Sequence, residues 1–580
     1  MTGIPRPRLT IVVVLAFGLI APMLPVLEAA VSGSRMADDA RRFLFWMVSW
    51  RDPRLFEGDY IANFYQALSP AGYRWLYWLA DRIGIAPISM HLAVPVVIAP
   101  IATYLIFRVC THVGTRTWHT TLATGVACAN MVASGHIYSG TPRAFAWIYL
   151  PLFLLAMVER RPWLAMSSIT LAGLFYPVLL PVLAGALIVS DLVSILTVSS
   201  LRRWLPGALP TLLNLALAAA FVLYYLLAST AHGGNWSYGE ARTLATLQPG
   251  GRNAFFPAAD LPSHVEFWLW GMRSGVLPYH WIEDWLYVAC VVPVLFVLLG
   301  RAFVRHARGA VKELSLSLLA LLTSALVLWA LSHLTLFRGY LPSRFTEFVL
   351  CLIPGPALAM MLAWLDPMLT PVKVRGIARR GGRLEVATGL AAFAIGFGLI
   401  WMSPRPNYVT TLHPQLHQYL RQQMPQPTVA SLEQEVDNIP AFGVGRILVG
   451  HEFLYSYNKA FHRAFGDRVE AVVQGLAALR PEPLQRLKET YGVTHVLLDE
   501  RDVNSLHTML AENWAVRNFP RVGSLIGELR GNDPQALLAQ WGPGCVATRS
   551  STLLLIDVEC VLNAASAAEL PVTDRTSQPN

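Results

Sequence analysis

The sequence predicts an α-helical polytopic membrane protein with a small α/β domain at its C-terminal end. Three observations predict this class: repeated apolar stretches, basic residues in alternate loops, and a more polar final part after residue 404. The composition agrees, because 54% of the 580 residues are hydrophobic and only 14% are charged, which is unusually apolar for a soluble protein.

About eleven stretches approach the roughly 20 apolar residues that span a bilayer as a helix. The shorter ones carry the weaker signal. They lie near residues 9–31, 87–107, 119–135, 144–158, 162–178, 180–199, 207–229, 284–304, 314–336, 345–366 and 384–403.

Basic residues occupy every second connection between these stretches. Because such residues resist translocation, these connections are predicted to be cytoplasmic. The N-terminus is predicted to be cytoplasmic as well. The chain is expected to be a multi-pass protein of the plasma (inner) membrane. Loops 32–86 and 230–283 and the part after residue 404 then face outward. The net charge of +9 is explained by these turns and predicts no nucleic-acid partner. The basic residues are Arg6, Arg8, Arg108, Arg116, Arg160, Arg161, Arg202, Arg203, Arg301, Arg305, Arg308, Lys312, Lys373, Arg375, Arg379, Arg380 and Arg383.

The chain is therefore expected to divide into a transmembrane domain, 1–404, and an extracytoplasmic α/β domain, 405–565, followed by a flexible tail, 566–580. Short buried strands are predicted at 446–450 and 493–499, and helices at 481–491 and 502–513. Cys545 and Cys560 are the only cysteines after residue 404. In an oxidising compartment they are candidates for a disulfide that closes a hairpin whose second strand is 551–558.

The sequence argues against several classes of membrane protein. It contains no G-x-x-x-x-G-K-[ST] phosphate loop, which disfavours an ATP-driven machine. Asp191 is the only clearly interior carboxylate of the stretches, whereas ion-coupled transporters usually hold several. The two halves do not visibly repeat each other, as the halves of many transporters do.

Polar residues concentrate directly after the first stretch. Phe43, Trp46, Met47 and Trp50 recur at helical spacing, which predicts an amphipathic helix on the outer membrane interface with Asp38 and Asp39 at its N-terminus. Both aspartates could simply cap the helix. A carboxylate in a partly dry cleft could instead act as a general base that takes the proton of an attacking hydroxyl.

The Asp-Asp pair after the first span, the interfacial helix, the acidic element Glu57-Gly58-Asp59, about eleven spans and an outward α/β domain together resemble the GT-C superfamily. These are polytopic glycosyltransferases that use polyprenyl-phosphate-linked sugars. They include the protein O-mannosyltransferases, the aminoarabinose transferases and the oligosaccharyltransferases. The likeness covers the whole chain in layout, but in motif mainly residues 36–60.

The resemblance implies sugar transfer from a polyprenyl-phosphate donor in the membrane to an extracytoplasmic glycan, lipid or cell-envelope acceptor. The catalytic carboxylate would be Asp38 or Asp39, with Asp59 as the second acidic site and Glu57 beside it. The chain has Asp-Asp where the mannosyltransferases carry Asp-Glu, and it lacks the W-W-D motif of the oligosaccharyltransferases. A divalent metal cofactor stays open, because two loop carboxylates such as Asp39 and Asp59 suit a hard cation.

Two arginines stand in short outward turns, where basic residues are disfavoured. Arg143 follows Gly-Thr-Pro, and Arg344 follows Pro-Ser. An inverting transfer expels a lipid phosphate, whose charge an arginine fork can stabilise. A bond to a helix-terminal carbonyl or, for Arg344, a pair with Glu347 would also explain them.

The second long loop carries several aromatic residues, Trp268 and Tyr279 among them, on a stretch predicted to lie along the membrane surface. Such residues settle at the membrane interface whatever their function, and a lid that stacks a sugar or prenyl chain is the alternative. The function predicted from the sequence is therefore a membrane glycosyltransferase. A carrier or flippase for a polyprenyl-linked glycan and a non-catalytic envelope assembly protein are the alternatives.

Overall fold

The structure of the chain is a computed structural model. It forms two compact units, each built from several segments of the chain. Unit 1 is Met1–Ala40, Ser69–Ala231 and Ala259–Val409, and unit 2 is Arg41–Leu68, His232–Ala258 and Thr410–Asn580. The structure describes residues 12–33, 35–113, 116–197, 201–230, 234–283, 291–295, 309–337, 340–369, 378–403, 408–529 and 536–569.

Some of the expected features fall outside the described residues. These are the span near 284–304 apart from 291–295, the basic residues Arg6, Arg8, Arg301, Arg305, Arg308, Lys373 and Arg375, and residues 570–580 of the expected tail. The earlier part of that tail is helical, because α28 continues to Glu569.

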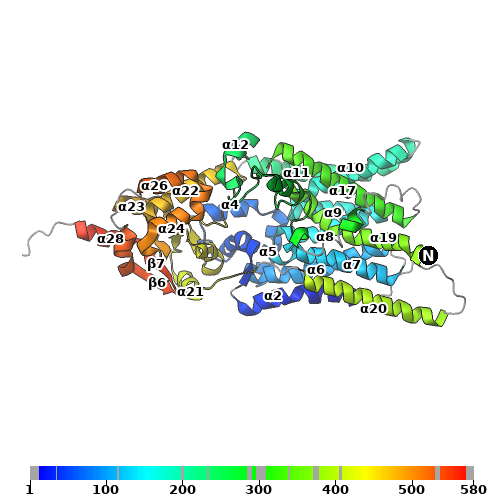
Figure 1. The fold of residues 1–580 in the computed structure, drawn as a ribbon, viewed down its shortest axis with the longest axis horizontal. Helices are drawn as coiled ribbons and strands as arrows, with labels where there is room; N and C mark the ends of the chain where they lie inside the picture. Colours follow the sequence, from blue (N-terminus) through cyan, green and yellow to red (C-terminus); the bar gives the residue numbers. More distant parts are fainter. Residues whose placement is uncertain are drawn as a thin grey trace, which may run out of the picture. The chain divides into compact units, whose positions relative to one another are not determined.

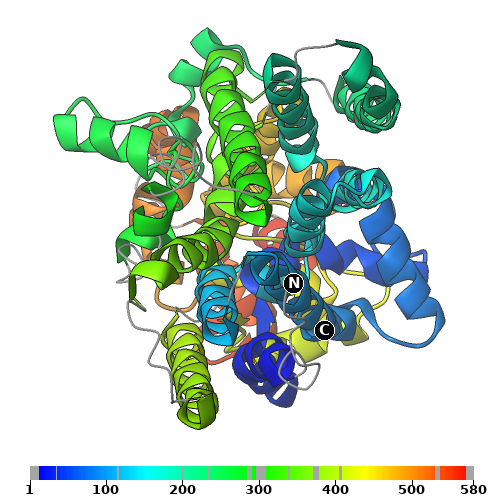
Figure 2. The same ribbon diagram turned by 90° about the vertical axis from the view of Figure 1, so that its right-hand side faces the viewer.

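Unit 1 is almost entirely helical, and its long helices lie side by side as a bundle (Figure 1) that Figure 2 views from one end. Two short strands, β1 (Arg35–Ala37) and β2 (Tyr408–Thr410), pair with each other. The helical elements are η1 (Ala16–Ile20), α2 (Ala21–Ser32), α5 (Ala71–Arg82), α6 (Pro87–Thr111), α7 (Thr117–Ala133), η3 (His136–Ser139), η4 (Pro142–Phe145), α8 (Ala146–Glu159), α9 (Pro162–Phe175), η5 (Pro177–Leu179), α10 (Leu180–Thr197), α11 (Leu201–Thr230), α13 (Leu261–Leu269), α14 (His280–Glu283), α17 (Ala310–Thr335), α18 (Ser343–Leu352), α19 (Pro354–Leu369) and α20 (Ala378–Met402).

Several of these helices are long and apolar enough to cross a membrane. Among the described residues there are five, and a sixth if a pair bent by 45°, Val12–Ile20 and Pro25–Ser32, is one span. Shorter apolar helices occupy other expected spans. The chain is thus a helical membrane protein, and eleven spans remain a prediction. The five are Pro87–Thr111, Pro142–Glu159, Leu209–Leu227, Ala310–Thr335 and Ser343–Leu365.

Charged side chains join the helix ends that the sequence assigns to the same side of the membrane. At the end of α8, Glu159 accepts a hydrogen bond from Arg108 of α6 at 3.0 Å, and Arg160 pairs with Glu313 of α17 at 2.6 Å. These are ends predicted to be cytoplasmic. The opposite end of α8 begins beside Arg143, so the two ends of the bundle carry separate polar clusters.

Small residues let helices of this bundle approach closely. A Cβ atom added at Gly125 of α7 would lie 2.5 Å from the Cα atom of Gly396 in α20. Helix association in membranes depends on such close packing, because lipid offers little hydrophobic driving force between helices. We infer that this glycine pair fixes the α7–α20 contact.

Unit 2 is an α/β unit around a five-stranded sheet of order β4-β3-β5-β7-β6. The pairs β3–β4 and β3–β5 are parallel, and β5–β7 and β6–β7 are antiparallel. All five residues of β5 are buried, as expected for a strand covered on both faces. The strands are β3 (Thr428–Ala430), β4 (Arg446–Ile447), β5 (His495–Asp499), β6 (Val546–Ser550) and β7 (Leu553–Asp557).

Helices from three separate parts of the chain complete unit 2. The two loop segments that the sequence assigned to the transmembrane domain contribute η2 and α4, and α12 and η6. The helical elements are η2 (Phe45–Trp50), α4 (Tyr60–Leu68), α12 (Tyr238–Thr243), η6 (Ala245–Leu247), α21 (Pro414–Gln422), η7 (Gln434–Asn438), η8 (Ile439–Gly443), α22 (Lys459–Leu476), α23 (Pro481–Tyr491), η9 (Val503–Ser505), α24 (Leu506–Glu512), α25 (Trp514–Asn518), α26 (Pro520–Leu529), α27 (Leu537–Trp541), η10 (Gly542–Cys545) and α28 (Val558–Glu569).

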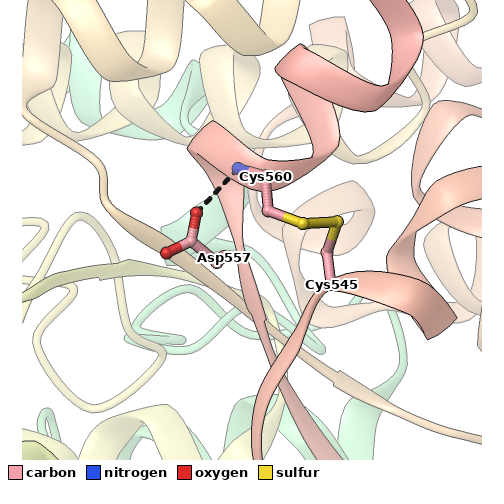
Figure 3. Close-up of a disulfide and its surroundings, with 3 residues drawn as sticks. All are labelled: Cys545, Asp557 and Cys560. Atoms are coloured by element: carbon pink, nitrogen blue, oxygen red, sulfur yellow. Dashed lines mark hydrogen bonds between the residues drawn. A yellow bond between two sulfur atoms is a disulfide. The ribbon is translucent and has the colours of Figure 1, made fainter.

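A disulfide joins Cys545 and Cys560, as the sequence predicted, and closes the β6–β7 hairpin (Figure 3). Cys560 lies in the first turn of α28, where its backbone N–H donates to the Asp557 carboxylate at 2.8 Å. The crosslink therefore ties the start of the hairpin to the helix that follows it.

Candidate functional site

The candidate general base lies at the start of helix α3 (Asp38–Leu44), whose first turn contains Asp38 and Asp39. The Asp39 carboxylate accepts a hydrogen bond from Arg143 Nη1 at 2.9 Å, and about one fifth of each side chain is exposed. Two residues selected from separate loops thus form an ion pair within unit 1. Helix capping alone does not explain Asp39.

The helix that follows differs from the sequence prediction. Only Asp38–Leu44 is α-helical, and Phe45–Trp50 is the 3₁₀ helix η2. Phe45, Trp46 and Met47 are all buried, and three consecutive side chains cannot all face one side of an α-helix. The expected single amphipathic helix with one apolar stripe was therefore wrong after residue 44.

A tight turn positions Arg143. Gly140 has φ +58°, and a Cβ atom there would lie 2.6 Å from the His91 carbonyl oxygen, so only glycine fits. The Tyr77 hydroxyl donates to the Gly140 carbonyl at 2.6 Å, and Ser139 and Thr141 share a hydrogen bond of the same length. Pro142 then begins η4, which leads into α8. The turn is thereby fixed by a hydrogen bond from Tyr77 of α5 and by a hydrogen bond between two of its own side chains.

A second charged cluster forms at the start of α18. Arg344 pairs with Glu347 one turn later, which is the alternative that the sequence left open for this arginine. Glu347 also contacts His136 Nε2 at 2.9 Å. His136 packs on Phe348 with ring centroids 5.0 Å apart, so α18 and the turn before Arg143 are in contact.

The two clusters share one neighbourhood around Tyr176. This residue lies between α9 and η5, and its hydroxyl is within electrostatic reach of Arg143, Arg344 and Glu347. His280 of α14 lies near the same Glu347, and burial lowers the pKa of His280 to about 4, which keeps it neutral at pH 7. Unit 1 thus gathers two arginines, two carboxylates, two histidines and a tyrosine at one end of its bundle.

Sequence reasoning missed His136 and Tyr176, and it placed His280 only among the residues of the aromatic loop. His136 stands in the same predicted outward turn as Arg143, seven residues before it, and this was a usable signal. Tyr176 precedes Pro177 between two apolar helices, where a polar ring at a helix break could have been noticed. Nothing in the sequence connects either of them with Glu347.

Three other acidic residues of the first long loop, Asp52, Glu57 and Asp59, belong to unit 2. Asp59 accepts a hydrogen bond from the Ala62 backbone N–H at 2.6 Å at the start of α4, and burial raises its pKa to about 6. Glu57 is exposed, and Asp52 pairs with Arg54 at 2.8 Å. Asp59 therefore caps a helix, and its role in transfer stays a prediction.

The aromatic residues of the second long loop are partly exposed. Trp268 is 47% exposed and contacts the rings of Trp329 and His333 in α17, and Tyr279 is 39% exposed. This arrangement suits either an aromatic belt or a lid. Among the described residues, no group of three or more His, Cys, Asp or Glu side chains could hold a metal ion.

An open hollow of about 590 Å³ lies in unit 2. It is lined by two arginines, Arg463 and Arg521, and two carboxylates, Asp467 and Glu470, together with aromatic and small residues. None of the predicted site residues lines it, and the clustered charges of unit 1 remain the better candidate for chemistry.

Comparisons with known proteins find similarity in structure only. No family model matches the sequence, and no curated protein matches it. A solved structure of the archaeal oligosaccharyltransferase AglB from Archaeoglobus fulgidus, with an inhibitory peptide and a dolichol-phosphate, has 11% identity and a TM-score of 0.48 over 89% of this chain and 71% of that chain. The apo form of the Archaeoglobus fulgidus enzyme gives 13% identity and a TM-score of 0.49 over the same shares.

A further structure of the Archaeoglobus fulgidus oligosaccharyltransferase, in complex with Zn and sulfate, has 12% identity and a TM-score of 0.48 over 89% of this chain and 70% of that chain. At such identities the similarities assign no role to any residue.

Proposed function

We propose that the chain is a GT-C-type membrane glycosyltransferase that transfers a sugar from a polyprenyl-phosphate donor to an extracytoplasmic acceptor. The observation that carries the proposal is the pairing of Asp39 with Arg143 at 2.9 Å. It puts the candidate general base beside a candidate phosphate ligand, although 104 residues separate them in the sequence. An acid and a cation side by side suit a reaction that removes a proton and expels an anion.

The proposed step is a direct, inverting displacement. The oxygen of an acceptor hydroxyl attacks the anomeric carbon and forms the new C–O bond while the bond to the phosphate oxygen breaks. The electron pair of that bond stays on the departing polyprenyl phosphate, and the proton of the hydroxyl goes to the Asp39 carboxylate. Asp38, in the same helical turn, is the alternative base.

The arginines stabilise the charge that the phosphate gains as the bond breaks. In the structure each is paired with a carboxylate, Arg143 with Asp39 and Arg344 with Glu347. A bound phosphate competes with Asp39 for Arg143, and the exchange frees the carboxylate to accept a proton. Phosphate binding would thereby prepare the base, because a carboxylate without its cation has a higher proton affinity.

The remaining predicted residues are proposed to contact the acceptor and the lipid-linked sugar. Asp59 and Glu57 orient the acceptor or a divalent metal, and Trp268 and Tyr279 cover the sugar or the prenyl chain. The acceptor is a glycan, lipid or cell-envelope polymer outside the plasma membrane. A carrier or flippase that escorts the same lipid, and an assembly protein without catalysis, are the rival functions.

Reconstitution into proteoliposomes with a radiolabelled polyprenyl-phosphate sugar tests the proposal. A glycosyltransferase releases free polyprenyl phosphate in an amount that matches the sugar found on the acceptor. A carrier moves the intact donor across the membrane without cleaving it, and an assembly protein does neither. Intact donor after prolonged incubation with a broad set of envelope acceptors would overturn the proposal.

A further inference from the structure

Tyr176 occupies a break between two helices at the charged end of unit 1. Its backbone leaves the helical conformation, with φ −146° and ψ 81°, because Pro177 disfavours a helical residue before it. Its carbonyl accepts a hydrogen bond from the Tyr149 hydroxyl at 3.2 Å, and its ring packs on Phe348 of α18 at a centroid distance of 5.9 Å. Backbone and ring are thus both fixed.

The Tyr176 hydroxyl is buried, and among the described residues it has no hydrogen-bond partner. The whole residue is only 6% exposed. The Nε atom of Arg344, which is also buried, likewise lacks a partner in the part of the chain that the structure describes. A buried polar group without a partner is destabilising and uncommon, so each such group calls for an explanation.

The chemistry of these two groups indicates what binds them. Arg344 Nε can only donate a hydrogen bond, and the Tyr176 hydroxyl lies within electrostatic reach of Arg344 and Arg143 as well as of Glu347 and Tyr340. Two guanidinium groups around a hydroxyl favour a partner that accepts hydrogen bonds and carries negative charge. A phosphate meets both requirements, whereas a sugar hydroxyl is neutral and needs no cation.

We propose that the Tyr176 hydroxyl donates a hydrogen bond to the phosphate of the lipid donor, between Arg143 and Arg344. The inference rests on the proposed function and adds a residue to it. During transfer Tyr176 keeps its proton, and the electron pair of the broken sugar–phosphate bond stays on the phosphate oxygen. Its hydrogen bond strengthens as the phosphate gains charge, so Tyr176 stabilises the departing group more than the intact donor.

The test compares Tyr176→Phe with a matched variant, Tyr225→Phe, in the purified full-length protein. The Tyr225 hydroxyl donates to the Gly173 carbonyl of α9 at 2.8 Å and therefore already has its partner. The probes are undecaprenyl phosphate and uncharged undecaprenol, each measured as an inhibitor of sugar transfer. Apparent melting temperatures are recorded for both variants.

Tyr176→Phe should weaken inhibition by undecaprenyl phosphate by roughly 10- to 100-fold, the range for a hydrogen bond to a charged group, and leave inhibition by undecaprenol unchanged. Its melting temperature should not fall, because no bond within the protein is lost. Tyr225→Phe should melt earlier and bind undecaprenyl phosphate as the unmodified protein does. Tyr176→Phe should therefore lose affinity for undecaprenyl phosphate without loss of stability, and Tyr225→Phe should lose stability without loss of affinity.

Two results would overturn the inference. One is unchanged inhibition of Tyr176→Phe by undecaprenyl phosphate, and the other is an equal loss for the phosphate and the alcohol, which indicates a packing role. Arg143→Gln separates this failure from failure of the proposed function. If Arg143→Gln loses affinity for undecaprenyl phosphate and Tyr176→Phe does not, only the role of Tyr176 is wrong. If neither variant loses affinity, the phosphate site itself is wrong.

Discussion

Replacing Arg143 by glutamine tests whether its pair with Asp39 is both structural and functional. At 2.9 Å and an effective dielectric constant near 20, two unit charges attract by on the order of 5 kcal/mol. Desolvation and partial exposure reduce the net value to about 1 to 3 kcal/mol. Loss of one charge-stabilising donor slows an enzyme by about 10²- to 10³-fold. We therefore expect Arg143→Gln to melt earlier and to transfer sugar at least 100-fold more slowly.

A double-mutant cycle with Asp39→Asn supplies the assay. The cycle compares apparent melting temperatures and single-turnover rates for both single variants and the double variant. If the ion pair exists, Asp39→Asn in the Arg143→Gln background costs no further stability, because the lone carboxylate is removed. Additive losses of melting temperature would show that the two side chains do not interact, and an unchanged transfer rate in Arg143→Gln would refute its role on the phosphate.

Two further predictions concern unit 2. Burial, with the nearby Glu452 carboxylate, raises the pKa of Asp437 from its ordinary 3.8 to about 7, so the folded state holds a proton that the unfolded chain loses. Stability should fall as pH rises from about 4 to about 7 and then level off. At pH 8, Asp437→Asn should therefore unfold at a higher temperature than the unmodified protein, because its free energy of unfolding is larger by on the order of 4 kcal/mol. At pH 4 the two proteins should unfold at the same temperature. Equal melting curves at pH 8 would contradict this prediction. Removing the disulfide with Cys545→Ser and Cys560→Ser should lower the stability of unit 2 by about 3 kcal/mol, measured by hydrogen exchange in β6 and β7, because the bond closes a loop with a separation of 15 residues. Equal exchange in oxidised and variant protein would contradict this estimate.

Local patterns in the sequence predicted many elements of the fold. The helix predicted at 481–491 is α23, which begins at Pro481 and ends before Gly492, two residues that favour these ends. The strand predicted at 493–499 contains β5, whose unbroken apolar run marks a buried strand. Alternating basic turns predicted which helix ends of unit 1 lie together, as Arg108 and Glu159 show.

Contacts over long separations could not be predicted. His136 and Glu347 are 211 residues apart, and no local pattern relates them. The same holds for unit 2, whose two loop segments were assigned to the transmembrane domain because they lie between spans in the sequence. Composition and periodicity report on neighbours along the chain, whereas these assignments depend on which surfaces meet after folding.

The charged end of unit 1 nevertheless contains three residues selected from the sequence. The sequence singled out Asp39 because it is a carboxylate at the start of a predicted helix. It singled out Arg143 and Arg344 because basic residues are disfavoured in short outward turns. Single charged residues that lie together in the structure could thus be selected from the sequence, whereas the pairing of Arg143 with Asp39 and the place of Tyr176 needed the structure.

The most direct measurement is single-turnover release of polyprenyl phosphate from a labelled polyprenyl-phosphate sugar by Asp39→Asn, with Asp38→Asn as its matched neighbour. If Asp39 is the general base, its variant still binds the donor but releases the phosphate about 10²- to 10⁴-fold more slowly, whereas Asp38→Asn remains active. Release at the unmodified rate by both variants would contradict the role of this helical turn in catalysis.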